Sequence, residues 1–338
     1  MFNSKLMIDC IDAHTGGEPL RIITSGLPPI LGNTILEKRR YVKDNLDDLR
    51  KLMMLEPRGH DDMYGCIMVD PVTDDGDFGV LFTHNEGLST MCGHGIIAVT
   101  KTMIELGRIP SKEGENIVRI DSPAGRITAF ADVENGSVKQ VRFQNVPCFM
   151  YKEDIVISLE KYGDIVCDIV YCGAFYIYVN VNKLKLSVLP EYGKLLTDIG
   201  MKMKYDVEER MEIVHPIDTG ITGIYGTIFY ENVVRDGDVL DTKNVCIFAE
   251  GQVDRSPTGT GTGGRVALHY HKGEMKKGDT LRNLSIIDTL MCAKVLEDTQ
   301  IAGYNAVLTE VSGTAHIMGI NKLLLDPEDP LPEGFRIR

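Results

Sequence analysis

The feature that most limits what this chain can fold into is an internal repeat. The run Met63-Tyr-Gly-Cys-Ile67 is echoed by Ile224-Tyr-Gly-Thr-Ile228, and Cys92-Gly-His-Gly95 is echoed by Thr258-Gly-Thr-Gly261. The glycine-rich motif follows the first motif at a similar distance in both halves of the chain. Each glycine-rich motif also precedes apolar residues at helical spacing. We therefore expect two copies of one α/β unit, facing each other so that both helix N-termini point at one ligand.

The length of the chain agrees with such a division. A chain of 338 residues is longer than a typical domain of about 150 residues. We place the first half at residues 1–145 and the second at residues 146–317, and we expect residues 318–338 to pack back on the first half. No Pro-rich or Ser-rich linker marks the join.

Hydrophobic patterning predicts many short strands and a few helices. Glu134-Asn-Gly136 predicts the tight turn of a hairpin. Two charged, amphipathic segments, residues 36–55 and 184–203, are typical of surface helices. Further helices are expected at residues 96–106 and 265–272, and strands at 6–11, 20–23, 66–69, 78–83, 117–120, 127–133, 138–146 and 245–249.

Composition and charge narrow the possible partners. The net charge of −13 argues against nucleic acid or an anionic membrane, because both require clustered Lys and Arg. The N-terminus lacks the apolar core of a signal peptide, and no segment reaches the length of a membrane span. We therefore expect a cytoplasmic protein that acts on a small molecule.

The eight cysteines are scattered along the chain and include no CxxC pair. A structural zinc site is therefore not expected. Disulfides are arithmetically possible, but the absence of an export signal favours free thiols in a reducing compartment.

Cys92 has the sequence surroundings of a reactive thiol. Nearby glycines allow backbone to approach a ligand closely, and the predicted helix begins a few residues later. At a helix N-terminus the N–H groups and the dipole favour a thiolate and can lower the thiol pKa from about 8.5. The N–H groups of Gly93 and His94 can also bind a substrate carboxylate. The alternative is that Cys92 is a small apolar side chain of the core.

The loop that contains the second glycine-rich motif allows three interpretations. As a dinucleotide loop it matches GxGxxG, but the preceding strand ends at Ala249, too far from the glycines. As a P-loop it lacks the lysine after the last glycine. As a structural turn it has no need of so many glycine and hydroxyl residues. We favour a ligand-binding loop, in which Asp254 pairs with a substrate ammonium while the N–H groups of Gly259 and Thr260 bind a carboxylate.

Several motifs together resemble the proline racemase family. They are His14-Thr-Gly-Gly-Glu18, Arg58-Gly-His60, Tyr64-Gly65, Met91-Cys-Gly-His94, Asp121-Ser-Pro-Ala-Gly125, Asp254-Arg-Ser-Pro257, Gly259-Thr260 and Gly313-Thr-Ala315, and they extend over nearly the whole chain. The resemblance implies an α/β (α+β) fold like that of diaminopimelate epimerase. In such a fold, two pseudo-symmetric halves each wrap a β-barrel-like mixed sheet around a central helix.

One catalytic position departs from the pattern that the resemblance implies for racemases and epimerases, which is a cysteine in each half. Thr258 stands where the second cysteine is expected, and this substitution resembles the trans-3-hydroxy-L-proline dehydratase branch. Stereoinversion at Cα requires a base on one face and an acid on the other. A threonine hydroxyl has no accessible pKa near neutrality, and its sequence neighbours include no obvious base to activate it. Leu88, where many relatives have an aromatic residue, is a second, milder departure.

The resemblance therefore implies elimination of water. In trans-3-hydroxy-L-proline the hydroxyl lies on the same ring face as the Cα hydrogen, so one residue can serve both groups. We expect the Cys92 thiolate to remove the Cα proton, and the thiol or an adjacent water to protonate the departing hydroxyl, giving a pyrroline carboxylate. Thr258 would orient the ring from the other side. No cofactor is expected, because no phosphate-binding loop remains for pyridoxal phosphate.

Two alternatives stay open from the sequence. One is a proline racemase or 4-hydroxyproline 2-epimerase, with another residue in place of the second thiol. The other is a catalytically silent amino-acid-binding protein, although binding alone does not require Cys92. A homodimer is an expectation of the resemblance. His14 and Glu18 can form a metal pair, but a hydrogen-bonded structural role is favoured, as it is for His60, and no metal is expected.

Overall fold

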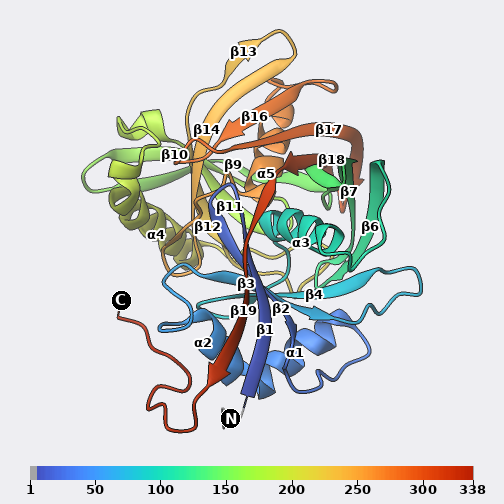
Figure 1. Cartoon of the computed structure of the whole chain (residues 1–338). Coiled ribbons are helices and arrows are strands. Elements are labelled where there is room, and N and C mark those ends of the chain that lie inside the picture. The colour runs from blue at the N-terminus through green and yellow to red at the C-terminus, as the bar shows by residue number, and fades with distance from the viewer. Residues whose placement is uncertain (1–5, 338) are drawn as a thin grey trace. The chain divides into compact units, whose positions relative to one another are not determined.

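The computed structural model describes residues 6–337, which form two compact units. Unit 1 contains the chain up to Val141 and again from Thr314 onward, and unit 2 is Arg142–Gly313 (Figure 1). The strand that follows residue 313 pairs with the first strand of unit 1, so the end of the chain belongs to the first half. No helix among residues 6–337 is long and apolar enough to cross a membrane.

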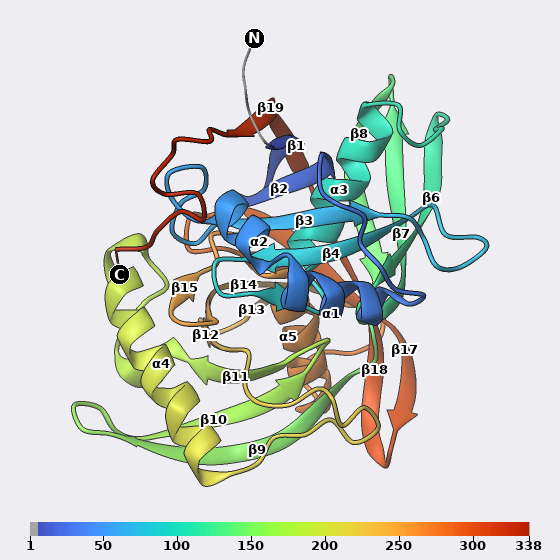
Figure 2. The same cartoon turned by 90° about the horizontal axis from the view of Figure 1, so that it is seen from below.

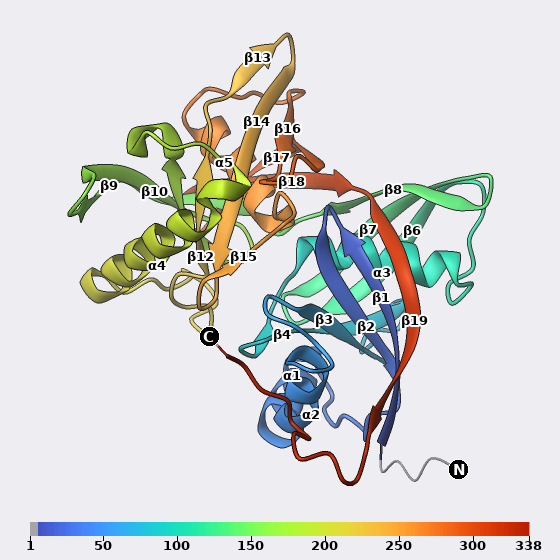
Figure 3. The ribbon, with the colours of Figure 1, turned by 60° about the vertical axis from the view of Figure 1, so that its left-hand side comes forward.

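Unit 1 is a curled mixed sheet with helices on both faces. Its elements are β1 (Leu6–Thr15), β2 (Glu18–Ser25), α1 (Ile35–Asn45), α2 (Asp47–Met54), β3 (Tyr64–Val69), β4 (Phe78–His84), β5 (Leu88–Ser89), α3 (Gly93–Glu105), β6 (Gly114–Ser122), β7 (Gly125–Glu134) and β19 (Ala315–Leu325). The order across the sheet is β19, β1, β2, β3, β4, β6, β7, with β2–β3 and β4–β6 parallel. Helix α3 contacts both ends of this order, β19 and β7, so the sheet wraps around it. Figure 3 shows α1 and α2 on the other side of β3 and β4.

Unit 2 is a closed barrel around a helix. Its elements are β9 (Cys148–Leu159), β10 (Gly163–Tyr171), β11 (Phe175–Asn180), η1 (Val181–Leu184), η2 (Pro190–Tyr192), α4 (Gly193–Arg210), β12 (Gly226–Tyr230), β13 (Val234–Asp236), β14 (Val239–Phe248), β15 (Gln252–Val253), α5 (Gly259–His271), β16 (Thr280–Leu284), β17 (Leu290–Ile301) and β18 (Tyr304–Gly313). Hydrogen bonds run from β9 through β10, β11, β12, β14, β16, β17 and β18 and return to β9. Helix α5 packs on β9, β10, β17 and β18. The predicted barrel-like sheet around a central helix is confirmed.

The same pairing scheme occurs in both units. In unit 1 the parallel pairs β2–β3 and β4–β6 flank a short hairpin, β4–β5, that leads into α3. In unit 2 the parallel pairs β11–β12 and β14–β16 flank the hairpin β14–β15 that leads into α5. The glycine-rich repeat in the sequence thus corresponds to a repeated strand–hairpin–helix unit.

Alternate residues of the unit 2 strands face two different helices, as the period of a β-strand requires. Ile228 of β12 lies against α5 at Gly261, whereas the next residue, Phe229, lies against α4 at Gly200. On β11, Tyr178 donates a hydrogen bond to the carbonyl of Gly261 at 3.0 Å. In Figure 2 the strands β10 and β11 run between α4 and α5. A tyrosine-bearing face thus supports the start of α5, while the apolar core of unit 2 lies on the α4 side.

A buried charged contact fixes the later turns of α5. Arg265 is fully buried, and its guanidinium lies 4.1 Å from the ring centroid of Tyr230, the last residue of β12. It donates to Thr242 Oγ1 of β14 at 3.1 Å and to His269 Nε2 at 3.2 Å. Burial lowers the pKa of Arg265 to about 10 and that of His269 to about 4. The arginine therefore stays charged at neutral pH and ties α5 to two barrel strands.

The predicted hairpin turn is confirmed, and two helix predictions are wrong in their bounds. Asn135 and Gly136 have φ values of 52° and 73° and form the two-residue turn between β7 and β8 (Ser137–Gln144). The helix expected at 36–55 is two helices that meet at Leu46. The helix expected at 184–203 begins only at Gly193, because the residue before Pro190 is held in an extended conformation.

The prediction that all cysteines are free is wrong for one pair. Cys148 and Cys172 form a disulfide, with Cα atoms 4.4 Å apart. The antiparallel register of β9 and β10 pairs Phe149 with Tyr171. It therefore brings Cys148, which precedes Phe149, opposite Cys172, which follows Tyr171. Strand register, which composition does not reveal, therefore creates this pair.

The fit of α5 inside the barrel gives a test of its packing. A Cβ atom added at Gly264 would lie 2.1 Å from Tyr178 Oη, whereas one added at Gly193, in the first turn of α4, would meet nothing within 4 Å. We expect Gly264→Ala to lower the free energy of unfolding by about 2–3 kcal/mol through overpacking. The matched change Gly193→Ala should leave it unchanged or slightly higher. Urea denaturation followed by circular dichroism measures both, and equal midpoints would contradict the close packing.

Candidate active site

Cys92 is the N-cap residue of α3. Its φ and ψ of −150° and 106° are extended, and its sulfur accepts a hydrogen bond from the N–H of Gly95 at 3.2 Å. Its carbonyl accepts from Ile96 N at 3.0 Å, the first bond of the helix. The sulfur thus occupies the place that a serine or aspartate oxygen takes in an ordinary N-cap, where the helix dipole favours negative charge. The helix begins at Gly93, three residues earlier than predicted, and this brings Cys92 to its start.

A missing side chain allows this approach of sulfur to backbone. A Cβ atom added at Gly95 would lie 2.8 Å from Cys92 Sγ and 2.9 Å from the ring of Phe82. The thiol is 5% exposed, and His94 lies beside it with Nδ1 3.3 Å from the sulfur. The sulfur of Cys92 therefore has a backbone N–H donor and an imidazole ring beside it.

Aromatic and hydroxyl groups of unit 1 hold His94. Its ring meets Tyr64 edge-on, with centroids 4.9 Å apart, and Tyr64 Oη lies 2.5 Å from Ser89 Oγ. Thr15 Oγ1 donates to the His94 carbonyl at 2.9 Å. Tyr64 and Thr15 fall in motifs of the resemblance, but their contacts with His94 are too distant in sequence to be inferred from spacing.

Three other cysteines outside the disulfide have raised thiol pKa values. Burial raises the pKa of Cys10 to about 11 and that of Cys167 to about 12, and it raises the pKa of Cys66 further. Because the thiolate is the reactive form, these side chains are inert parts of the core.

In unit 2, the residues from Asp254 to Thr258 form a loop closed by hydrogen bonds. Thr258 Oγ1 donates to Asp254 Oδ2 at 2.7 Å, and Asp254 Oδ1 accepts from Ser256 N at 2.8 Å. Thr258 N donates to Ser256 Oγ at 3.1 Å. The expectation that Thr258 has no base beside it is wrong, because the loop folds back and brings the carboxylate to the hydroxyl. A carboxylate is too weak a base to ionise an aliphatic alcohol, so the contact orients the hydroxyl without making it a nucleophile or an acid.

Three buried side chains, those of Asn244, Thr262 and Asn283, support this loop through hydrogen bonds. The carbonyl of Pro257 accepts from Asn244 Nδ2 and from Thr262 Oγ1, both at 3.0 Å. Asn283 Nδ2 in turn donates to Asn244 Oδ1 at 2.6 Å. These hydrogen bonds link Pro257 to β14, α5 and β16, so the backbone next to Thr258 is held from several directions.

The backbone of Thr258 is strained. Its φ and ψ are 64° and 106°, in a region that β-branched residues rarely adopt. The helix α5 starts at the next residue, Gly259, six residues earlier than predicted, and Thr258 gives it no side-chain cap bond. The first N–H groups of a helix have no acceptor within the helix itself, so the start of α5 suits an anion such as a carboxylate.

Thr260, expected to offer only its backbone, also has a side-chain partner. Its Oγ1 lies 2.7 Å from the Tyr176 hydroxyl, and both residues are buried. Burial raises the pKa of Tyr176 well above its usual value, so the phenol stays protonated. Sequence reasoning missed Tyr176, and its alternation with Tyr178 on a strand was the signal that could have identified it.

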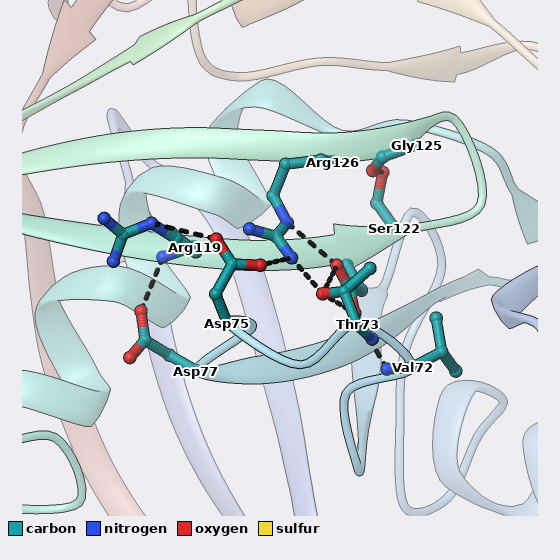
Figure 4. Close-up of polar contacts among 9 residues, drawn as sticks. Val72, Thr73, Asp75, Asp77, Arg119, Ser122, Gly125 and Arg126 are labelled. Carbon is teal, nitrogen blue, oxygen red and sulfur yellow. Dashed lines mark hydrogen bonds and ion pairs between the residues drawn. The ribbon is translucent and has the colours of Figure 1, made fainter.

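The remaining motif residues have structural contacts. His14 Nδ1 accepts from Gly17 N at 3.2 Å within the β1–β2 turn. His60 Nδ1 lies 2.6 Å from the carbonyl of Asp61. Asp121 accepts from Val72 N at 2.8 Å and from Arg126 Nε at 2.9 Å. Figure 4 shows the loop at Val72 and Thr73 gathered with Arg126 by these polar contacts, which fix the connection between β3 and β4.

Two repeated sheet-and-helix units, with a thiol at the start of one helix and a threonine at the start of the other, define a class of pseudo-symmetric α/β enzymes. A family model described as proline racemase matches residues 10–336, and the chain belongs to that family. It is 44% identical over 335 residues to a trans-3-hydroxy-L-proline dehydratase of Colwellia psychrerythraea, covering 99% of this chain and 94% of that protein. It is 43% identical over 331 residues to a 3-hydroxyproline 2-epimerase of Burkholderia multivorans, covering 98% of each.

A solved structure matches the whole fold. It is a hydroxyproline epimerase from Agrobacterium vitis with bound trans-4-hydroxy-L-proline, 29% identical, with a TM-score of 0.91 over 100% of this chain and 97% of that one. A phenazine biosynthesis protein of the PhzF family from Bacillus anthracis shares the fold at a TM-score of 0.61 and 13% identity, over 94% of this chain and 99% of that one. The expected fold class is therefore confirmed.

The strain at Thr258 predicts an inverted stability order. At a position with φ of 64°, glycine has no steric cost and alanine does. The free energy of unfolding of Thr258→Gly, measured by urea denaturation, should therefore exceed that of Thr258→Ala by about 1 kcal/mol. The matched pair is Thr262→Gly and Thr262→Ala inside α5, where alanine should be the more stable by about 1 kcal/mol. At each position the glycine and alanine variants lose the same hydroxyl hydrogen bonds, so the difference within each pair isolates the backbone. The same order at both positions would contradict the strain.

Proposed function

We propose that this protein is a trans-3-hydroxy-L-proline dehydratase, which eliminates water across Cα and C3 of its substrate without a cofactor. The observation that carries the proposal is the unequal chemistry of the two helix starts. Cys92 accepts a hydrogen bond from the N–H of Gly95 and lies beside the imidazole of His94, whereas Thr258 gives its only hydroxyl proton to Asp254. The capping position of α3 has a thiol, and that of α5 has an alcohol whose proton is donated to a neighbouring carboxylate. Relatives at 42–45% identity named as this dehydratase support the proposal.

Cys92 is the proposed base. The N–H of Gly95 and the positive end of α3 favour the thiolate that must remove the Cα proton. The resulting thiol, or a water next to it, protonates the 3-hydroxyl as the C3–O bond breaks. The electron pair of the Cα–H bond becomes the Cα–C3 double bond, water leaves, and the enamine product tautomerises to a pyrroline carboxylate.

Backbone donors supply the electrostatic part of the proposal. Charge builds on the substrate carboxylate as the Cα proton leaves, and donors that strengthen their bonds at that moment lower the barrier. The N–H groups of Gly93 and His94 on α3, with those of Gly259 and Thr260 on α5, are the proposed donors. Asp254 is the proposed partner of the ring ammonium, because its carboxylate oxygens have lone pairs beyond the two used within the loop.

An isomerase is the competing activity, since one relative is named 3-hydroxyproline 2-epimerase. Epimerisation needs a second acid to return a proton to the other face of Cα. Thr258 stands at the position of that acid in the pattern of the family, and its hydroxyl proton is engaged with a carboxylate. The dehydratase is therefore the favoured activity.

Removal of the proposed base should stop turnover and leave the fold intact. With trans-3-hydroxy-L-proline, the wild-type protein should form a pyrroline that o-aminobenzaldehyde colours. We expect Cys92→Ser to lower kcat by about 100- to 10,000-fold, because a serine hydroxyl is not ionised near neutrality. Cys246→Ser, at a buried cysteine of unit 2, is the control that should retain activity. No pyrroline from the wild type would refute the dehydratase, and a fully active Cys92→Ser would refute the mechanism.

A second thiol should add stereoinversion. Thr258→Cys provides an acid–base group at the start of α5, and we expect it to epimerise trans-4-hydroxy-L-proline, which has no leaving group at C3. Thr258→Ser keeps a hydroxyl and should not. Chiral chromatography of the two hydroxyproline epimers measures the reaction. Epimerisation by the unchanged protein at a comparable rate would favour the isomerase over the dehydratase.

A further inference from the structure

We propose that Asp254 is a positioning residue that turns the Thr258 hydroxyl into a hydrogen-bond acceptor for the substrate. The proposal rests on the proposed function and deepens it, because it specifies what the threonine does. Thr258 has one hydroxyl proton, and it is donated to Asp254 Oδ2 at 2.7 Å. What remains on Oγ1 is lone pairs, which accept from a ring N–H or from the 3-hydroxyl of a substrate and have no proton to deliver.

Neither partner of this bond can turn away easily. Asp254 and Thr258 are 4% and 7% exposed, and the second carboxylate oxygen is held by the N–H of Ser256. The Thr258 N–H is held by Ser256 Oγ, which fixes the backbone from which the side chain projects. On the other side, the methyl carbon Cγ2 of Thr258 lies 3.0 Å from the position of a Cβ added at Gly261, so the first turn of α5 fills that direction. The Thr258 hydroxyl therefore keeps its proton directed at Asp254 Oδ2.

This polarity has a chemical consequence. A threonine free to rotate could donate to the substrate and compete for the lone pairs of the carboxylate or of the 3-hydroxyl. When its proton is held by Asp254, the Thr258 hydroxyl can only accept a hydrogen bond. Its partner on the substrate must therefore be a donor, either the ring N–H of a secondary amino acid or the 3-hydroxyl. The Thr258 hydroxyl also withholds a proton from the carbanion-like Cα, which favours elimination over return of a proton.

A simpler role for Asp254 is to pair directly with the substrate ammonium and to have no effect through Thr258. The two roles differ in a double-mutant cycle. Asp254→Asn keeps the acceptor for Ser256 N but offers an N–H to Thr258 Oγ1, so the threonine proton must turn toward the ligand. Thr258→Val keeps the shape of the side chain and has no hydroxyl to turn. Loss of the ammonium partner is the same in both backgrounds.

The test measures kcat/KM for dehydration in the wild type, Asp254→Asn, Thr258→Val and the double variant, with Thr258→Ser as the control background that retains a hydroxyl. We expect Asp254→Asn to lower kcat/KM about 100-fold or more in the wild-type and Thr258→Ser backgrounds, and less than about 10-fold in Thr258→Val. The same fold loss in all three backgrounds overturns the proposal.

Failure of the proposed function is recognised separately. If the wild type forms no pyrroline, the dehydratase fails, and the same cycle is then measured on the Kd for L-proline by titration calorimetry. Coupling between positions 254 and 258 in that Kd supports the positioning role, and additivity overturns it. Circular dichroism of each variant shows that a loss does not come from unfolding.

Discussion

The rest of this structure depends on how two buried helix beginnings are satisfied. The first N–H groups of any α-helix lack acceptors within the helix, and a buried helix start without partners is costly. Gly93 and His94 at the start of α3, and Gly259 and Thr260 at the start of α5, are all buried. In α3 the sulfur of Cys92 accepts a hydrogen bond from the N–H of the third helical residue, Gly95. In α5 Thr258 caps nothing and turns its hydroxyl to Asp254 instead. The repeated units thus meet one physical requirement with different side chains, and the helix start without a cap suits the carboxylate of a ligand.

Glycine makes both arrangements possible. Gly95 lets the sulfur of Cys92 reach the backbone of its own helix, and Gly264 lets α5 approach the hydroxyl of Tyr178. A Cβ atom at Gly95 would displace the sulfur of Cys92, and one at Gly264 would displace the hydroxyl of Tyr178. The glycine-rich motifs, visible in the sequence as a repeat, therefore record close contacts of a central helix with its surroundings.

Much of this organisation was accessible from the sequence, because local chemistry and repetition reveal it. The repeat predicted two copies of one unit, the Asn-Gly turn was confirmed, and the motifs indicated the family. What the sequence left hidden depends on how the backbone folds and on which strands and helices come into contact. The proximity of Asp254 to Thr258 follows from a loop that folds back on itself, and the pairing of Cys148 with Cys172 follows from strand register. Tyr176 was missed because its contact with Thr260 joins a strand to a helix 84 residues later.

The strained backbone at Thr258 indicates that the side chain at this position has a role beyond folding. A φ of 64° suits glycine, and a glycine there would continue the glycine-rich run that follows. Yet the chain has a β-branched residue, held by Asp254 on one side and by the first turn of α5 on the other. Strained conformations persist where the surroundings over-determine them, and they gather at functional sites. The bracing of Pro257 by Asn244 and Thr262 provides such surroundings. Helix α5 could begin at a glycine without this strain, so folding alone does not explain a threonine at position 258. A hydroxyl held in one orientation on a rigid loop is instead suited to the proposed recognition of a small amino acid.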